Sequence, residues 1–380
     1  MLYVIPTADF TSPSSSLGVY KKIIAQCAAF ARLGYTPTLL CYENGSAVFK
    51  RHDRQIATYK ISSLMWKLGN YSHILQEYFK GNKGNYDLIY VRMGRETPFS
   101  LKAAKVFRKC SKRIVYEIPT YPYDSELLGI MKRHSFLRKI RSLISICLDR
   151  VCRSLLKKYI DCFAVMTDLD DVKEVFGAPA VKITNGIDVG SVPVRNRIPE
   201  ETIALIGVAS VNYWHGYDRI ICGLGEYYAS GKTRNVVFYL VGDGPDLSKL
   251  KRLTQDFGLE QRVIFHGTRV GKELDDLFDR ADIGVGSLGL HRKGFQASAE
   301  LKAREYCARQ IPFIGAGDDV DFTTDFKWRL QIDASDAPVD IEEMLAFHEN
   351  CIACASEIAE MRKFAVEHLS WETQLMKILG

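Results

Sequence analysis

Residues Ala281–Gly315 read ADIGVGSLGLHRKGFQASAELKAREYCARQIPFIG, and this stretch decides the fold. Its first apolar run, Asp282–Val285, is followed by Gly286 and is typical of a buried parallel strand. The segment Gly289–Ser298 is rich in Gly, Arg, Lys and Ser and is expected to form a loop. A helix is expected to begin at Ser298, a favourable N-cap residue, and a second strand at Ile311–Ile314. Strand, loop, helix and strand in this order predict an α/β unit.

The loop before the expected helix is the first candidate binding site. A loop that opens onto a helix N-terminus directs free N–H groups and the positive end of the helix dipole at a ligand, so it suits an anion. Glu305 lies two turns into the helix, on the face directed back toward this loop. The stretch therefore predicts an anionic ligand held near the helix start.

This pattern resembles the nucleotide-sugar site of retaining glycosyltransferases of family 4, which have the GT-B fold. In that family a Gly-Phe loop leads into a helix with two glutamates separated by seven residues, and the second, which binds the ribose hydroxyls, matches Glu305. The first falls at Ala297, where this chain departs from the pattern. The departure resembles a capsular or exopolysaccharide branch with the motif Ser-x-x-Leu-Lys-x-x-Glu-Tyr, matched by Ser298, Leu301, Lys302, Glu305 and Tyr306.

Length and composition limit the possible classes of protein. The chain has 380 residues, 47% of them apolar and 25% charged, which predicts two domains of an ordinary globular protein. Its net charge of +6 is too modest for a nucleic-acid partner. The C-x-x-C pair Cys351 and Cys354 has no second pair to complete a zinc site, and the scattered cysteines favour a reducing cytoplasm. No apolar run is long enough for a signal peptide or for the roughly 20 residues of a membrane span.

Several loops of the first half follow expected strands. The resemblance assigns the loop Thr7–Gly18, with Gly18 among the donor-binding residues, to the ligand site, and a plain turn before a helix at Val19–Leu33 is the alternative. Arg92 and Arg95 follow a strand end, where ligands bind in open α/β sheets, so they are candidate acceptor contacts or solvated surface residues. The expected strands are Leu2–Pro6, Pro37–Tyr42, Asp87–Val91, Arg113–Glu117 and Phe163–Met166.

The segment Glu117–Tyr123 reads EIPTYPY and combines two prolines with two tyrosines. Aromatic rings pack against the C–H faces of sugars, so Tyr121 and Tyr123 are candidate acceptor-binding residues. The resembled branch carries the same stretch. Many members of the wider family have a histidine here and this chain has none, so Glu117 is the nearest ionisable candidate for catalysis. A carboxylate satisfied by neighbouring backbone N–H groups is the alternative.

Residues 132–158 carry nine Lys or Arg and a single acidic residue, Asp149. Apolar residues recur at helical spacing and predict a basic amphipathic helix or two. Either this apolar stripe packs into the core, or the segment lies against an anionic membrane surface. The resemblance favours the membrane, because many relatives build on lipid-linked acceptors. The stripe consists of Leu137, Ile140, Ile144, Cys147, Val151 and Leu155.

Two aspartate pairs suggest metal sites, and we reject both. Asp168 and Asp170 are expected to open a helix at Val172–Phe176, where aspartates act as caps and dipole partners. Asp319 and Asp321 are expected in a loop without a third ligand. We therefore expect no metal, and no cofactor apart from a nucleotide-sugar donor.

The second half begins after an Asn-Gly turn signal at Asn185-Gly186-Ile-Asp188, which is similar to a motif before the interdomain linker of the family. The expected domains are residues 1–193, which bind the acceptor, and 194–364, which bind the donor. A terminal helix in 365–380 would cross back onto the first domain. The resemblance implies two Rossmann-like, doubly wound α/β domains that face each other across a cleft.

The loop after the expected strand Ile203–Val208 is the other half of the expected donor site. Family members carry an arginine and a lysine here that grip the diphosphate, and Ser210 and His215 stand in their register. A diphosphate would raise the pKa of His215 and make it a cation, with Lys302 supplying the fixed charge. A neutral, core-packed His215 is the alternative. Further expected donor contacts are Asn212, Gly216, Gly242 and Gly244.

The resemblance implies a metal-independent, hexosyl-type transferase that moves a sugar, with retention, from a nucleotide diphosphate to a lipid-linked or growing polysaccharide. Its location would be the cytoplasmic face of the plasma membrane, and its catalytic candidates are Glu117, His215 and Lys302. Two alternatives stay open. A sugar-nucleotide epimerase on the same fold would use Glu117 and Glu300 for proton transfer. A non-catalytic sugar-nucleotide-binding subunit would explain the missing cations and first glutamate.

Overall fold

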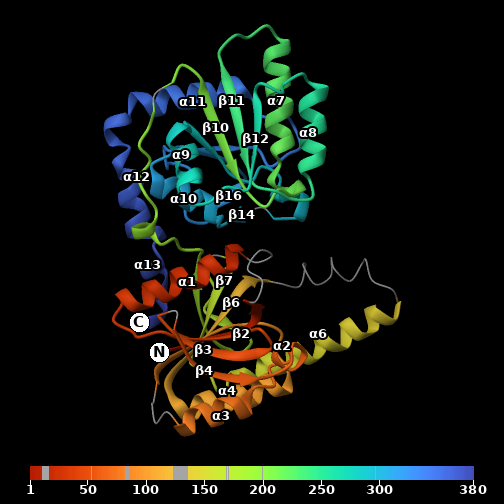
Figure 1. Cartoon of the computed structure of the whole chain (residues 1–380), viewed down its shortest axis with the longest axis vertical. Coiled ribbons are helices and arrows are strands. Elements are labelled where there is room, and N and C mark those ends of the chain that lie inside the picture. Colours follow the sequence, from red (N-terminus) through yellow and green to blue (C-terminus); the bar gives the residue numbers. More distant parts are fainter. Residues whose placement is uncertain are drawn as a thin grey trace. The chain divides into compact units, whose positions relative to one another are not determined.

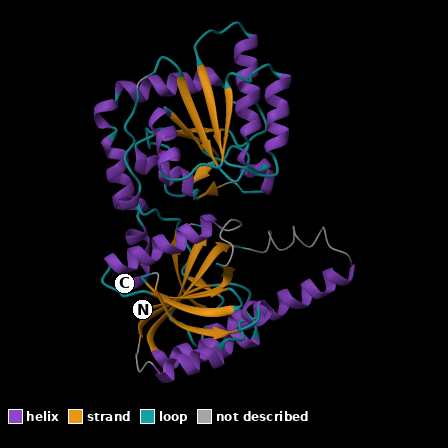
Figure 2. Ribbon diagram, viewed as in Figure 1, coloured by secondary structure: helices purple, strands orange, loops and turns teal. Residues whose placement is uncertain are grey.

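The computed structural model describes residues 1–10, 17–52, 54–81, 86–122, 136–167, 169, 171–198, 200–295 and 297–380, without the side chains of residues 7–9, 17, 136–142 and 298. The chain divides into two compact units. Unit 1 comprises Met1–Thr184 and Gln374–Gly380, and unit 2 comprises Asn185–Thr373. Each unit is an α/β sandwich around a sheet with mostly parallel strands (Figures 1 and 2).

In unit 1 the described residues form a nine-stranded sheet in the order β4-β3-β2-β1-β5-β6-β7-β9-β8. Strands β3, β4 and β8 pair antiparallel at the two edges, and the strands between them are parallel. The strands are β1 (Leu2–Asp9), β2 (Thr38–Glu43), β3 (Ser46–Arg51), β4 (Arg54–Lys60), β5 (Tyr86–Arg92), β6 (Ser111–Tyr121), β7 (Cys162–Thr167), β8 (Glu174–Val175) and β9 (Ala178–Ile183).

Helices cover both faces of this sheet, with α1 on one side and α3 and α4 on the other (Figure 1). The central strands β5 and β6 are therefore buried on both faces, which explains their continuous apolar runs. The helices are α1 (Leu17–Arg32), α2 (Ser63–Lys67), α3 (Ser72–Gly81), α4 (Pro98–Cys110) and α6 (Phe136–Leu156). The last helix of the chain, α13 (Trp371–Leu379), lies within the range 365–380 expected for a terminal helix, and Arg113 of β6 donates to its Leu379 carbonyl at 2.7 Å.

Helix α6 presents its apolar stripe to solvent over the part whose side chains are described. Ile144 is 63% exposed and Val151 57%, and Cys147 and Leu155 are exposed as well. The core-packed interpretation of this stripe is therefore wrong for these residues, while Leu137 and Ile140 lie outside the described side chains. The face that α6 buries instead consists of Asp149, Cys152, Arg153 and Leu156. None of the helices in the described part of the chain has the length and hydropathy to span a membrane.

Unit 2 is built on a six-stranded parallel sheet in the order β12-β11-β10-β13-β15-β17. Helices α7 and α8 lie on one side of it and α9 and α10 on the other (Figure 1). The strands are β10 (Ile203–Val208), β11 (Val236–Val241), β12 (Val263–Gly267), β13 (Ile283–Val285), β15 (Phe313–Ala316) and β17 (Arg329–Ile332), and β14 (Ala297–Ser298) pairs with β16 (Asp318–Asp319). The helices are α7 (Tyr217–Ala229), α8 (Leu247–Asp256), α9 (Lys272–Arg280), α10 (Leu301–Arg309), α11 (Ile341–Ala353) and α12 (Ala359–Phe364).

The strand order of both units reverses at the centre of the sheet, as in doubly wound folds. The chain runs outward from β10 through β11 to β12 and then returns to β13 on the other side of β10. In unit 1 the corresponding reversal lies between β1 and β5. The predicted doubly wound α/β class is confirmed, and such reversals are where ligands bind, outside the carboxyl ends of the strands.

Two expected helix positions are wrong. The helix expected at Val172–Phe176 is absent, because Phe176 and Gly177 have φ angles of 51° and 77° and form the turn of the β8–β9 hairpin. Ser298 does not begin a helix, because it pairs with Asp319 in the small β14–β16 ladder. Helix α10 begins at Leu301 and its N-cap residue is Glu300.

Candidate functional site

The donor-binding candidates of unit 2 lie on loops at the carboxyl ends of its strands, around the reversal between β10 and β13. Loop 209–216 follows β10, loop 242–245 follows β11, and loop 286–289 follows β13. Glycines allow these loops to touch. A Cβ added to Gly244 would lie 2.2 Å from the Val211 carbonyl oxygen, and one added to Gly216 would lie 2.6 Å from the Leu288 carbonyl carbon. Gly242, with φ 128°, approaches Ala209 in the same way.

His215 lies on the β10 loop in a short 3-10 turn with a defined tautomer. Its Nδ1 accepts a hydrogen bond from the backbone N–H of Asn212 at 3.0 Å, so Nε2 is the nitrogen that carries the hydrogen. Burial and then the charge of Lys302 lower the pKa of His215 to about 3. The expectation of a raised pKa concerned the donor-bound state, and the ligand-free protein has the opposite shift. Ser210 is exposed, and its carbonyl accepts from the Asn212 side chain at 2.8 Å.

Lys302 stands in the first turn of α10 and joins this helix to the first residue of α7, directly after the β10 loop. Its Nζ donates to the Tyr217 hydroxyl at 3.3 Å and lies 3.6 Å from the Glu300 carboxylate. Burial lowers the pKa of Lys302, while Glu300 opposes that shift. Glu300 in turn accepts from the Ser287 N–H with both oxygens, at 3.0 and 3.2 Å. The start of α10 is thus fixed both to the start of α7 and to the loop after β13.

The three other candidates of the helix region differ in exposure and in the contacts that hold them in place. Glu305 is partly exposed and its Oε1 accepts from Arg309, one turn on, at 3.0 Å. That ion pair leaves Oε2 for a ligand hydroxyl. Leu301 is 39% exposed at the helix start. Ser298 is fixed by its backbone in the β14–β16 ladder.

Arg304 forms the most deeply buried ion cluster of the described residues, and the sequence did not predict it. Its guanidinium is fully buried and donates to both oxygens of Asp319, at 2.6 and 2.7 Å, and to Asp321. The carboxylates of Asp319 and Asp321 are thus engaged by an arginine. Because Asp319 also belongs to β16, this cluster holds the backbone of the loop before α10 against the helix. No group of three or more potential metal-ligating side chains occurs among the described residues.

In unit 1, Glu117 is the centre of a buried polar cluster. It is fully buried, its Oε2 accepts from Gln26 at 2.8 Å and from Tyr90 at 2.7 Å, and its Oε1 pairs with Arg92 and lies 3.4 Å from Lys22. Burial alone would raise the pKa of Glu117, but Lys22 and Arg92 lower it to about 2. With both oxygens engaged, Glu117 holds strands and helix α1 together, and we assign it a structural role in place of the catalytic one.

The remaining candidates of unit 1 lie near the ends of β5 and β6. Arg95 is exposed after β5 and donates to the Ser145 hydroxyl of α6 at 3.3 Å, whereas Arg92 is committed to Glu117. The Tyr121 ring packs edge-on against Phe176, with centroids 6.3 Å apart. Gly18 is exposed in the first turn of α1. Tyr123, Asp168 and Asp170 lie outside the described residues.

Comparison with known proteins gives a family model that matches part of unit 2 and solved structures that match the fold. Residues 202–320, which span β10 to β16, match the family model described as glycosyl transferases group 1. No curated protein matches the sequence.

Solved structures match over the full chain. A glycosyltransferase from Rickettsia africae is 13% identical with a TM-score of 0.64, covering 100% of this chain and 96% of its own. WaaG, a glycosyltransferase involved in lipopolysaccharide biosynthesis, is 14% identical with a TM-score of 0.61, covering 100% and 98%. HepE from Anabaena, in complex with UDP and glucose, is 14% identical with a TM-score of 0.58, covering 100% and 98%. At these identities the likeness shows the fold, which is that of GT-B glycosyltransferases.

Proposed function

We propose that this protein is a glycosyltransferase that takes a sugar from a nucleotide diphosphate. The observation that carries the proposal is the convergence of three loops and the start of α10 at the strand-order reversal of unit 2, within the stretch that matches the glycosyltransferase family model. The glycines of these loops let a ligand approach the backbone closely. A neighbour of the same fold holds UDP and glucose, which supports a nucleotide-sugar donor.

The residues at this reversal suit a departing diphosphate. Lys302 contributes a positive charge from a site where burial strengthens electrostatic interactions, and His215 contributes an Nε2–H donor beside it. Glu305 has one carboxylate oxygen available for ribose hydroxyls. We propose that these groups hold the donor without a metal ion.

In the reaction that we propose, the bond between the anomeric carbon and the diphosphate oxygen breaks first, and the leaving group keeps the electron pair. An acceptor hydroxyl attacks on the same face, and the departing phosphate oxygen takes its proton, so that configuration is retained. The fully engaged Glu117 is not part of this scheme, and no base among the described residues is required by it.

We further propose that the acceptor is borne by a lipid and that the protein works at the cytoplasmic face of an anionic membrane, in capsule, exopolysaccharide or O-antigen synthesis. The support is the stripe of α6, because a row of exposed apolar side chains on a basic helix fits the boundary between headgroups and acyl chains. The described stripe residues are Ile144, Cys147, Val151 and Leu155, and the neighbouring Leu143 and Leu148 are exposed as well.

The geometry favours a transferase over the epimerase. An epimerase needs carboxylates that exchange protons with the sugar. Glu117 is buried in its cluster, and Glu300 is occupied by the Ser287 N–H and Lys302. The non-catalytic alternative rests on the missing arginine and lysine of the family. Lys302 supplies a cation in their place, which favours turnover.

One experiment separates the three functions. The full chain is incubated with a panel of UDP-, GDP- and other nucleotide sugars, with and without lipid-linked glycans, and products are analysed by mass spectrometry. A transferase gives a product one sugar heavier that depends on the acceptor. Conversion of the sugar nucleotide without acceptor would indicate an epimerase, and tight donor binding without any product would indicate a binding subunit.

A further inference from the structure

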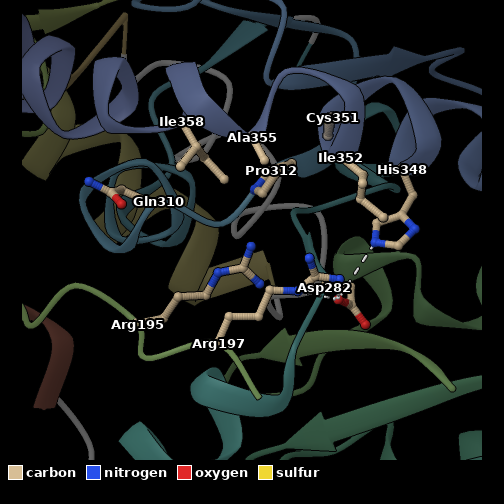
Figure 3. Close-up of a pocket in the computed structure, with 10 residues that line it drawn as sticks. All are labelled: Arg195, Arg197, Asp282, Gln310, Pro312, His348, Cys351, Ile352, Ala355 and Ile358. Atoms are coloured by element: carbon tan, nitrogen blue, oxygen red, sulfur yellow. Dashed lines mark hydrogen bonds and ion pairs between the residues drawn. The ribbon is translucent and has the colours of Figure 1, made fainter. Parts of the chain in front are cut away.

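Unit 2 contains a cavity of about 160 Å³ at the end of its sheet opposite to the candidate donor site. Asp282, directly before β13, and Pro312, directly before β15, both line it. The cavity therefore lies at the amino ends of the parallel strands, whereas the glycine loops lie at the carboxyl ends. Arg195 and Arg197, on the segment that leads into β10, form one wall (Figure 3).

Asp282 is the only carboxylate among the described residues that line this cavity, and both of its oxygens accept hydrogen bonds. Asp282 accepts from Arg197 at 2.8 and 3.2 Å with one oxygen, and from the Ala204 N–H at 3.0 Å with the other. The Nε2 atom of His348 lies 3.5 Å from the same carboxylate, as the dashed line in Figure 3 marks. Asp282 thus balances the charge of Arg197. Both of its oxygens already accept hydrogen bonds, so neither is left for a second arginine.

Arg195 is the second arginine, and the carboxylates that act on its charge, Asp282 and Asp279, do so from beyond ion-pair distance. One terminal nitrogen donates to the Ala281 carbonyl, and across the described chain its guanidinium has no carboxylate within 4.0 Å and its other nitrogens have no hydrogen-bond partner. Burial lowers the pKa of Arg195 to about 10. Because this half-buried guanidinium lies beyond ion-pair distance of both carboxylates, an anion that enters the cavity gains a charge-assisted interaction with it.

The opposite wall of the cavity is apolar. Ile352, Ala355 and Ile358 stand across from the two guanidinium groups (Figure 3). A ligand that fills the space has an anionic head toward Arg195 and a short apolar flank toward these side chains. The volume limits the ligand to a small molecule, too small for a nucleotide.

We propose that this cavity binds a small organic oxyanion, a carboxylate or phosphate monoester with a short aliphatic group. The ligand links the segment that carries Arg195 to α11 and to the strand starts, and so stabilises unit 2. The inference does not depend on the proposed sugar transfer, because neither donor nor acceptor takes part.

The test uses the full-length protein, with inorganic phosphate and monobutyl phosphate as probes at constant ionic strength. A probe at a concentration of ten times its dissociation constant should raise the melting temperature of unit 2 by roughly 3–6 °C. Titration calorimetry should give at least threefold tighter binding for monobutyl phosphate than for phosphate, because of the apolar wall. Equal affinities would contradict the apolar flank, and no binding of either probe would overturn the proposal.

Variants decide where the probe binds. Arg195→Gln should lose binding of the probe. Arg234→Gln, which changes an exposed, ion-paired arginine, is the matched control and should keep that binding. If Arg195→Gln fails to fold, Ile352→Phe takes its place, because it narrows the cavity without removing a charge. Lys302→Met should still bind the probe. Binding that survives in Arg195→Gln and Ile352→Phe but disappears in Lys302→Met would assign the anion to the donor site and overturn the proposal.

Discussion

Replacement of Arg304 by methionine tests the cluster that fixes the loop before α10. Methionine keeps most of the side-chain length but removes the guanidinium. Asp319 and Asp321 then stay in place with side chains only 3% and 12% exposed and without their cation. Breaking a buried ion pair in this way typically destabilises a protein by about 3–5 kcal/mol, because the remaining charges are left uncompensated.

We expect Arg304→Met to lower the free energy of unfolding of unit 2 by about 3–5 kcal/mol, a large part of the 5–15 kcal/mol of a typical domain. Urea unfolding followed by tryptophan fluorescence measures it, because Trp214, Trp328 and Trp371, three of the four tryptophans, belong to unit 2. The surface pair Arg234–Glu349 gives the control, since Arg234→Met should change stability by roughly 0.5 kcal/mol or less.

A double-mutant cycle separates the ion pair from simple loss of packing. In an Asp319→Asn background, Arg304→Met should be milder by about 1–3 kcal/mol, because one of the stranded charges is gone. Affinity for the nucleotide-sugar donor should fall in folded Arg304→Met, since α10 also carries Lys302 and Glu305. A loss of less than about 1 kcal/mol, or no coupling with Asp319, would refute the reasoning.

Three further predictions concern single sites. If Glu305 holds the ribose hydroxyls, Glu305→Ala should fold normally and lose roughly 2–4 kcal/mol of transition-state stabilisation, seen as kcat/KM, and a folded variant with wild-type kcat/KM would exclude the role. At a pKa of about 3 His215 is neutral at pH 7, and raising that value past 7 would require over 5 kcal/mol at about 1.4 kcal/mol per unit. Binding of the nucleotide-sugar donor should therefore take up no proton at His215. Uptake of one proton in calorimetry in several buffers, absent in His215→Lys, would contradict this. The double variant Ile144→Ser, Val151→Ser should weaken binding to phosphatidylglycerol vesicles by roughly 1–3 kcal/mol, while the equally exposed Val270→Ser should not, and unchanged flotation of the double variant would remove the membrane proposal for α6.

The sequence predicted the buried parallel strands best. Strand β10 has the expected bounds Ile203–Val208, because a strand buried on both faces appears as an uninterrupted apolar run. The β3–β4 hairpin went unpredicted. Its edge strand Arg54–Lys60 is largely exposed, so it has neither a continuous run nor a clear alternation. The turn at Phe176 was missed for a different reason, since a non-glycine residue with positive φ leaves no mark in the sequence.

The candidate site was predicted where local sequence determines it. Gly216, Gly242 and Gly244 are required by close backbone approaches, and such glycines are visible in the chain. The contacts that fix Lys302 and Glu300 were not predictable, because they join the start of α10 to residues up to 85 positions away in sequence. Arg304 stands on an otherwise apolar face of its helix, and this was the one signal in the sequence for a buried partner. The fold was needed to identify the two aspartates as that partner.

The two parts of unit 1 that we propose for the acceptor side, helix α6 and the loop after β5, are bonded to each other. The buried face of α6 contacts the backbone that follows β5: Asp149 accepts from the Glu96 N–H at 2.6 Å, and Arg153 donates to Asp149 at 2.8 Å and to the Gly94 carbonyl at 3.0 Å. This loop leaves the sheet at the reversal between β1 and β5, where a ligand of unit 1 is expected.

One face of α6 is therefore bonded to the loop that carries Arg95, while the opposite face exposes its apolar stripe. These bonds are buried, so the helix cannot move relative to the loop without breaking charge-assisted hydrogen bonds. A membrane that holds α6 would also fix the height of this loop above the lipid surface. In the proposed function, the anchor that recruits the enzyme is then the same element that sets the position of the acceptor-side loop.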